Sequence, residues 1–233
     1  MAVVLLLQGC ANFNGWKYTS EPKEFKQPDI NLSVVVPPFQ DLRSGRNSLC
    51  PFCIFALWVP FVPYIGVSEI NTPEVAQNVM TGMRPQEDLA KAIAEELENA
   101  TIFKKSFFSY DKDDGDLVLV GKINRFAVEQ YNTMYGISAF GEVLWVLGAP
   151  FGRVHNIVDI DYQILKNGTY ELVFSKKYYK DLYWNQGAFL MLIPYGNEIN
   201  LFEKVVKGMN MEFIADVKKN LEMMKKLAPT AKK

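Results

Sequence analysis

The sequence feature that most restricts the fold is a β-hairpin between residues 154 and 174. One face of its first strand is apolar and consists of Val154, Val158, Ile160, Tyr162 and Ile164. Asn167-Gly168 predicts a tight turn, after which Tyr170, Leu172 and Phe174 predict the returning strand. The chain is therefore expected to contain an antiparallel sheet with one apolar face.

Other segments predict further strands and two helices. Residues 31–36 and 117–131 have the pattern of strands, and residues 88–103 have apolar positions at helical spacing. A long amphipathic helix is predicted to begin at Asn200, with Glu203 completing a capping box. With 233 residues, 49% of them hydrophobic, the chain can form one large domain. We expect an α/β (α+β mixed) fold over residues 31–228, with a mixed sheet packed by helices and a frayed tail at 229–233.

The amino terminus contains a targeting pattern. Ala2 to Leu7 is apolar but too short to cross a bilayer as a helix. The following Leu7-Gln8-Gly9-Cys10 resembles the lipobox of bacterial lipoproteins. This resemblance implies that residues 1–9 are removed as a signal segment and that Cys10 is lipidated. Ala11, where aspartate would favour inner-membrane retention, implies the outer membrane, facing the periplasm. The alternative is a short buried strand with an incidental cysteine.

Residues 10–30 are predicted to form a polar tether behind the lipidated cysteine. The segment contains Pro22, Pro28 and many charges, and it has no apolar period. We therefore expect the folded domain to begin near residue 31.

Composition limits the possible chemistry. The formal net charge of -1 provides no overall attraction for nucleic acid or anionic lipid. Three cysteines and one histidine, His155, leave few ligands for a metal site, and no phosphate-binding glycine motif occurs. His155 is interpreted as structural. Asp159 and Asp161 could hold a cation, but more often such a pair lines a solvated face. We expect no metal, no cofactor, no nucleic-acid partner and no enzymatic activity.

Three apolar stretches end alike, in proline, an aromatic residue and glycine. They are residues 50–67, 143–152 and 189–196, and the first is eighteen residues without a charge. Two interpretations remain open: core strands that meet at one end of the sheet, or a surface for a membrane or a partner. The residues predicted for such a surface are Phe52, Trp58, Phe61, Tyr64, Trp145, Phe151, Leu190 and Tyr195.

The pair Cys50 and Cys53 has the Cys-x-x-Cys spacing of a redox motif. It resembles the active-site pattern of periplasmic thiol oxidoreductases, and this likeness implies a redox function for the two thiols. The alternatives are a local disulfide in an oxidising compartment or two buried thiols.

A second resemblance concerns the fold. The order of Val36-Pro37-Pro38-Phe39-Gln40-Asp41, a helix containing Leu97, and the strand Asp116-Leu117-Val118-Leu119-Val120-Gly121 is similar to the α/β domain of TolB and of the curli secretion lipoprotein. This resemblance implies a fold but no single activity. The main hypothesis is a lipid-anchored, non-catalytic accessory subunit of an envelope assembly, with an envelope protein or a second copy as partner. The alternatives are an oligomeric pore or secretion-channel lipoprotein and a periplasmic thiol oxidoreductase.

Overall fold

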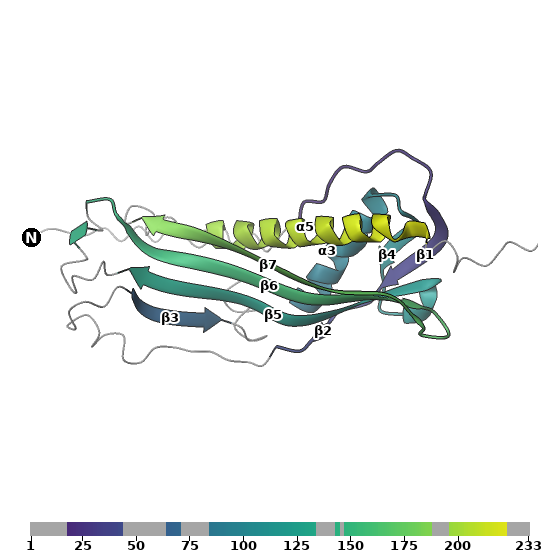
Figure 1. Ribbon diagram of the computed structural model, residues 1–233, viewed down its shortest axis with the longest axis horizontal. Coiled ribbons are helices and arrows are strands. Elements are labelled where there is room, and N and C mark those ends of the chain that lie inside the picture. The colour runs from purple at the N-terminus through teal and green to yellow at the C-terminus, as the bar shows by residue number, and fades with distance from the viewer. Residues whose placement is uncertain are drawn as a thin grey trace, which may run out of the picture.

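One mixed sheet forms the frame of the protein (Figure 1). The structure is a computed structural model that describes residues 18–43, 64–70, 84–133, 143–144, 147–187 and 196–222. The strands within these ranges are β1 (Ile30–Val36), β2 (Gln40–Asp41), β3 (Tyr64–Ile70), β4 (Phe103–Phe108), β5 (Leu117–Thr133), β6 (Pro150–Lys166) and β7 (Leu172–Gly187). The helices are α3 (Pro85–Asn99), the short 3₁₀ turn η1 (Lys112–Asp114) and α5 (Gly196–Lys219). The predicted α/β class is confirmed.

The sheet has the order β4-β1-β5-β6-β7. β1 lies parallel to both β4 and β5, whereas β5, β6 and β7 are antiparallel neighbours. β5 continues past the residues that pair with β1. Along this continuation, β2 pairs with β5 from Lys122 and β3 pairs with β5 from Val128. At about 3.3 Å per residue, the 17-residue strands β5 and β6 span about 55 Å.

The predicted hairpin is confirmed as β6 and β7. Its turn is wider than two residues, because it covers Asn167–Thr169 and Gly168 adopts a φ of 80°. Phe174 pairs with Ile164 on the apolar face. Leu172 begins β7 as predicted, but a register shift pairs it with Leu165 and its side chain is exposed. One additional residue in a strand is enough to turn the side chains that follow it to the opposite face of the sheet. The prediction for Tyr170 is wrong, because it lies before β7 with a φ of 52°.

Both helices cover the same face of the sheet. Alternate residues of β1, β5 and β6 and the apolar stripes of α3 and α5 form one buried cluster. Pro85 occupies the first turn of α3, and the carboxylate of Asp88 accepts a hydrogen bond from the backbone N–H of Arg84. In the part of the chain that the structure describes, no helix is both long and apolar enough to cross a membrane. The sheet face opposite α3 and α5 is called the open face below.

Two predicted helix boundaries are wrong. The helix predicted to reach Phe103 ends at Asn99, and Phe103 begins β4, a parallel edge strand that the pattern did not reveal. Thr101, with a φ of 51°, lies in the turn between them. The final helix begins at Gly196 rather than at Asn200, which lies within α5.

An aromatic cluster joins the sheet to α5. The ring of Tyr162 on β6 lies 4.7 Å from Phe213, 5.6 Å from Tyr178 and 5.7 Å from Phe39 between ring centroids. Tyr162 and Phe213 are completely buried. Ring pairs at these distances add to the stability gained by burying their area.

The approach of Phe39 to β5 requires glycine at position 121. A Cβ atom on Gly121 would lie 2.6 Å from the ring of Phe39. We expect Gly121→Ala to lower the free energy of unfolding by about 1–3 kcal/mol, measured by urea unfolding. Adding Phe39→Leu should recover part of this loss. If the two single effects simply add, the contact does not explain the requirement for glycine.

Candidate functional site

The strand ends at one side of the sheet bring together the borders of the three apolar stretches. Tyr64 of β3 pairs with Thr133 of β5, and Pro150 of β6 pairs with Gly187 of β7. Asn132 and Gly152 complete the row between β5 and β6. Figure 1 shows these strand ends together on the left, and we call this side the distal end. The first stretch leads into β3, the second leads into β6, and the third lies between β7 and α5.

Most of the predicted site residues lie outside the described residues. Tyr64 is the first residue of β3, and Phe151 is the second residue of β6, so both belong to strands at the distal end. The remaining predicted residues lie outside the described ranges: Cys10, Cys50, Phe52, Cys53, Trp58, Phe61, Trp145, Leu190 and Tyr195. Their roles remain predictions.

A charged cluster lies on the open face near the distal end. His155 on β6 lies between two carboxylates: its Nδ1 is 3.3 Å from Glu129 of β5 and its Nε2 is 2.7 Å from Asp181 of β7. Arg125 forms an ion pair with Glu129. The cluster therefore joins three adjacent strands, with carboxylates on β5 and β7 and the imidazole on β6 between them. Among the described residues, no group of three or more histidine, cysteine and acidic side chains is placed to hold a metal ion.

Asp159 and Asp161 both lie beside lysines. Asp159 pairs with Lys177 at 2.9 Å and accepts a hydrogen bond from Asn124 at 3.3 Å. Asp161 is the cross-strand neighbour of Lys122 on β5 and of Lys177 on β7. Lysines on both neighbouring strands therefore offset the negative charge of the pair.

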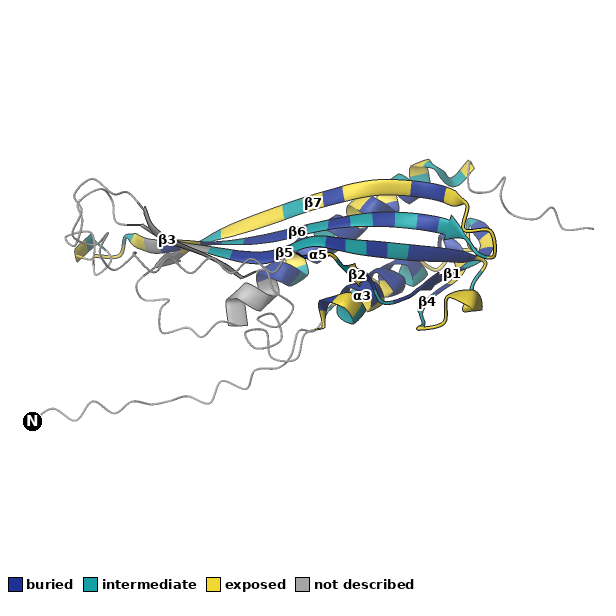
Figure 2. Ribbon diagram, turned by 90° about the horizontal axis from the view of Figure 1, so that it is seen from below, coloured by how far each residue is buried: buried dark blue, intermediate teal, exposed yellow. Residues whose placement is uncertain are grey.

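Aromatic side chains lie beside this charged cluster on β7. Tyr179 and Tyr183 are 53% and 62% exposed, respectively, and Figure 2 shows β7 with long exposed segments. The guanidinium of Arg153 lies 5.3 Å from the centroid of the Tyr183 ring. Tyrosine and arginine are enriched at protein interfaces. No motif in the sequence marks these two tyrosines, although strand alternation places both on the open face.

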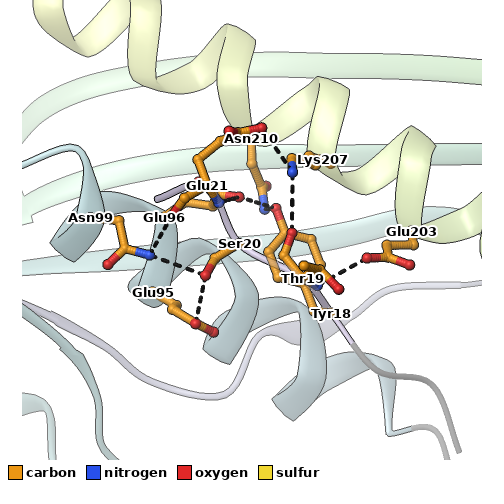
Figure 3. Close-up of polar contacts among 10 residues, drawn as sticks. All are labelled: Tyr18, Thr19, Ser20, Glu21, Glu95, Glu96, Asn99, Glu203, Lys207 and Asn210. Atoms are coloured by element: carbon orange, nitrogen blue, oxygen red, sulfur yellow. Dashed lines mark hydrogen bonds and ion pairs between the residues drawn. The ribbon is translucent and has the colours of Figure 1, made fainter. Parts of the chain in front are cut away.

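The segment Tyr18–Asp29 lies across α3 and α5, and we call it the strap. Figure 3 shows its first residues, Tyr18 to Glu21. The backbone N–H of Thr19 donates to Glu203 of α5 at 2.9 Å, and the hydroxyl of Ser20 donates to Glu95 of α3 at 2.6 Å. Further along, the backbone N–H of Glu24 donates to the carbonyl of Asn99 at 2.7 Å. The carboxyl-terminal part of the predicted tether therefore contacts both helices.

A chain of hydrogen bonds connects the strap to the core. The hydroxyl of Tyr18 donates to the buried carboxylate of Glu96 at 2.7 Å and accepts from Asn210 at 3.3 Å. Asn210 in turn accepts from Tyr162 at 3.1 Å. Burial, followed by the hydrogen bond to Glu96, raises the pKa of Tyr18. Burial alone raises the pKa of Tyr162. Both hydroxyls are held in their neutral, donating form.

Comparison with known proteins supports the fold. No protein-family model and no curated protein matches the chain. The chain is similar to a Xanthomonas campestris protein of the DUF330 family, with a TM-score of 0.50 and 10% identity over 91% of this chain and 96% of that one. It is also similar to a candidate lipoprotein from Caulobacter crescentus, with a TM-score of 0.35 and 12% identity over 57% and 80% of the two chains, respectively. The PelC dodecamer protein from Paraburkholderia phytofirmans has a TM-score of 0.31 and 9% identity over 83% and 95%. At 10% identity, the first likeness shows a shared fold and no shared activity.

The buried hydroxyl of Tyr162 predicts a loss of stability at high pH. In the unfolded chain this tyrosine ionises near pH 10, whereas the folded protein keeps it neutral. Its contribution is complete below pH 10 and should fall by about 1.4 kcal/mol for each pH unit above it. Urea unfolding between pH 9 and pH 11 measures this slope. Tyr162→Phe should give a shallower slope, and equal slopes in the two proteins would contradict the assignment.

Proposed function

We propose that this protein is a lipid-anchored, non-catalytic accessory subunit of a bacterial envelope assembly. It is held at the outer membrane by Cys10, faces the periplasm and acts by binding a partner. The observation that supports this proposal best is the grouping at the distal end. The strand pairs Tyr64–Thr133 and Pro150–Gly187 bring the borders of three apolar stretches to one side of the sheet. Apolar surface gathered at one place is typical of a binding site.

The lipid anchor rests on the lipobox resemblance and on the position of the strap. Cys10 precedes the docked Tyr18 by only eight residues. Several acyl chains on one cysteine hold a protein on a membrane stably, whereas a single chain binds only marginally. Under this proposal the acyl chains hold the protein on the membrane.

The open face supports binding rather than catalysis. His155, the only histidine in the sequence, contacts the carboxylates of Glu129 and Asp181, one at each ring nitrogen. These two contacts hold the imidazole ring in one orientation. Tyr179 and Tyr183 add exposed aromatic surface beside it. This combination of aromatic and charged side chains fits a protein partner better than a small-molecule reaction.

Intact mass and fractionation test the anchor. We expect the mature protein to begin at Cys10, to carry acyl chains and to sediment with membranes. Cys10→Ser should lose the acyl mass and leave the membrane fraction, because serine offers no thiol for acylation. Cys53→Ser is the matched control and should keep both properties. A mature protein with a free Cys10 thiol and the leading nine residues still attached would end the proposal.

Site-specific photo-crosslinking in membranes tests the distal end. A photoreactive amino acid at Trp58 or Trp145 should crosslink to an envelope protein or to lipid, because we place the binding surface there. The matched control is Tyr170, which is 55% exposed beside the β6–β7 turn, opposite the distal end. Equal crosslinking at all three positions, or none at either tryptophan, would count against the distal surface.

A further inference from the structure

We propose that the strap is a fixed attachment point that holds the α3 and α5 layer toward the lipid leaflet and directs the open face away from it. The partner of this helix layer is thus a lipid surface, reached through the anchor at Cys10. The inference rests on the proposed lipid anchor, but it concerns a separate property, which is the orientation of the folded body.

The contacts of the strap are numerous and reach into the core. Tyr18 meets Glu96 of α3 and Asn210 of α5, so its hydroxyl connects both helices. Release of the strap would remove the donors that Glu96 receives from Tyr18 and from the backbone N–H of Glu21. A buried carboxylate that loses its donors is destabilising. This cost favours the docked strap.

Ion pairs continue the contact along the strap toward β1. Glu21 pairs with Lys207 of α5 at 2.8 Å, and Lys23 pairs with Glu98 of α3 at 2.7 Å. Each exposed pair contributes little by itself. Because they alternate between α5 and α3, however, they fix the direction in which the strap crosses the two helices. The chain toward Cys10 therefore leaves from the helix side of the molecule.

The docked strap shortens the link to the lipid. Eight residue steps separate Cys10 from Tyr18, and at about 3.4 Å per step they reach about 27 Å at most. If the strap were free, the link would continue to Ile30, the first residue of β1, and would reach about 68 Å. Docking thus keeps Tyr18 within about 27 Å of the leaflet.

This length also restricts orientation. A helix is about 10 Å across and lies about 10 Å from the sheet that it covers, so the two layers are about 20 Å thick. The link between Cys10 and Tyr18 starts on the helix side and reaches about 27 Å at most. To arrive at the open face it would have to pass around a body about 20 Å thick, which uses most of that length. We therefore expect the helix layer to face the leaflet and Tyr179 to face away from it.

The charges of the helix layer do not drive this orientation. The α5 surface near the strap contains both Lys204 and Glu203, whereas the acidic residues of α3 outnumber its one lysine, Lys91; they are Glu87, Asp88, Glu95, Glu96 and Glu98. Acidic side chains do not attract anionic headgroups, so the orientation depends on the anchored strap. Attachment should depend on the anchor and not on ionic strength.

Energy transfer to a lipid-borne acceptor tests the orientation. A Cys50→Ser, Cys53→Ser background is coupled through Cys10 to a maleimide lipid in phosphatidylcholine vesicles, so the test does not depend on natural acylation. A fluorescent amino acid replaces either Met211, which is 42% exposed on α5, or Tyr179 on the open face. We expect greater energy transfer from position 211 than from position 179.

Two variants separate docking from tether length. Tyr18→Ala with Glu21→Ala removes strap contacts and should lower the transfer from position 211 and reduce its excess over position 179. The second variant has twelve Gly/Ser residues inserted after Asn14, which keeps the strap residues and lengthens the link to about 68 Å. It should also lower the transfer from position 211 and reduce its excess over position 179. This result tests the inference even if the first variant unfolds. Equal transfer from both positions in the parent protein overturns the inference. So does a folded Tyr18→Ala, Glu21→Ala variant with unchanged transfer. Absence of acyl chains on natural Cys10 overturns only the proposed function.

Discussion

Tyr162 is the residue at which the sheet, α5 and the strap meet. Its ring contacts Phe39, Tyr178 and Phe213, and its hydroxyl donates to Asn210. The ring contacts fix α5 over β6 and β7 through apolar burial, whereas the hydroxyl orients the amide that reaches Tyr18. One completely buried tyrosine on the central hairpin thus positions the segment that leads toward Cys10. The geometry of attachment depends on the core of the sheet.

Local patterns predicted the elements whose apolar residues recur at regular spacing. The alternation that ends at Ile164 gave the β6–β7 hairpin, because strand faces repeat every two residues. β4 was missed because lysines and a serine separate its phenylalanines, and its pairing partner, β1, lies far away in the sequence. The start of α5 was misplaced for a related reason: Asn200 and Glu203 fit a capping box, but the helix continues back to Gly196. A local cap pattern cannot exclude a longer helix.

The candidate site was less predictable than the fold, because its contacts join distant parts of the chain. Tyr18 bonds to Glu96 and Asn210, which lie 78 and 192 residues away, so no local pattern indicates the strap. His155 stood out in the sequence as its one histidine, but its two carboxylate partners became visible only through the strand register. The three apolar stretches were visible as sequence, whereas their common border became visible only through strand pairing.

The strap and the distal end divide the protein into surfaces with different tasks under the proposed function. The strap brings the lipid anchor to the helix layer, whereas β5, β6 and β7 place their distal end about ten residues, or about 33 Å, along the strands from Tyr162. This separation exceeds the reach of about 27 Å between Cys10 and Tyr18. A body that stood on its distal end, with the strands perpendicular to the leaflet, would therefore hold Tyr18 beyond the reach of the anchor. With the helix layer facing the leaflet, as inferred above, the strands run along the leaflet and direct the distal end sideways, toward a partner protein.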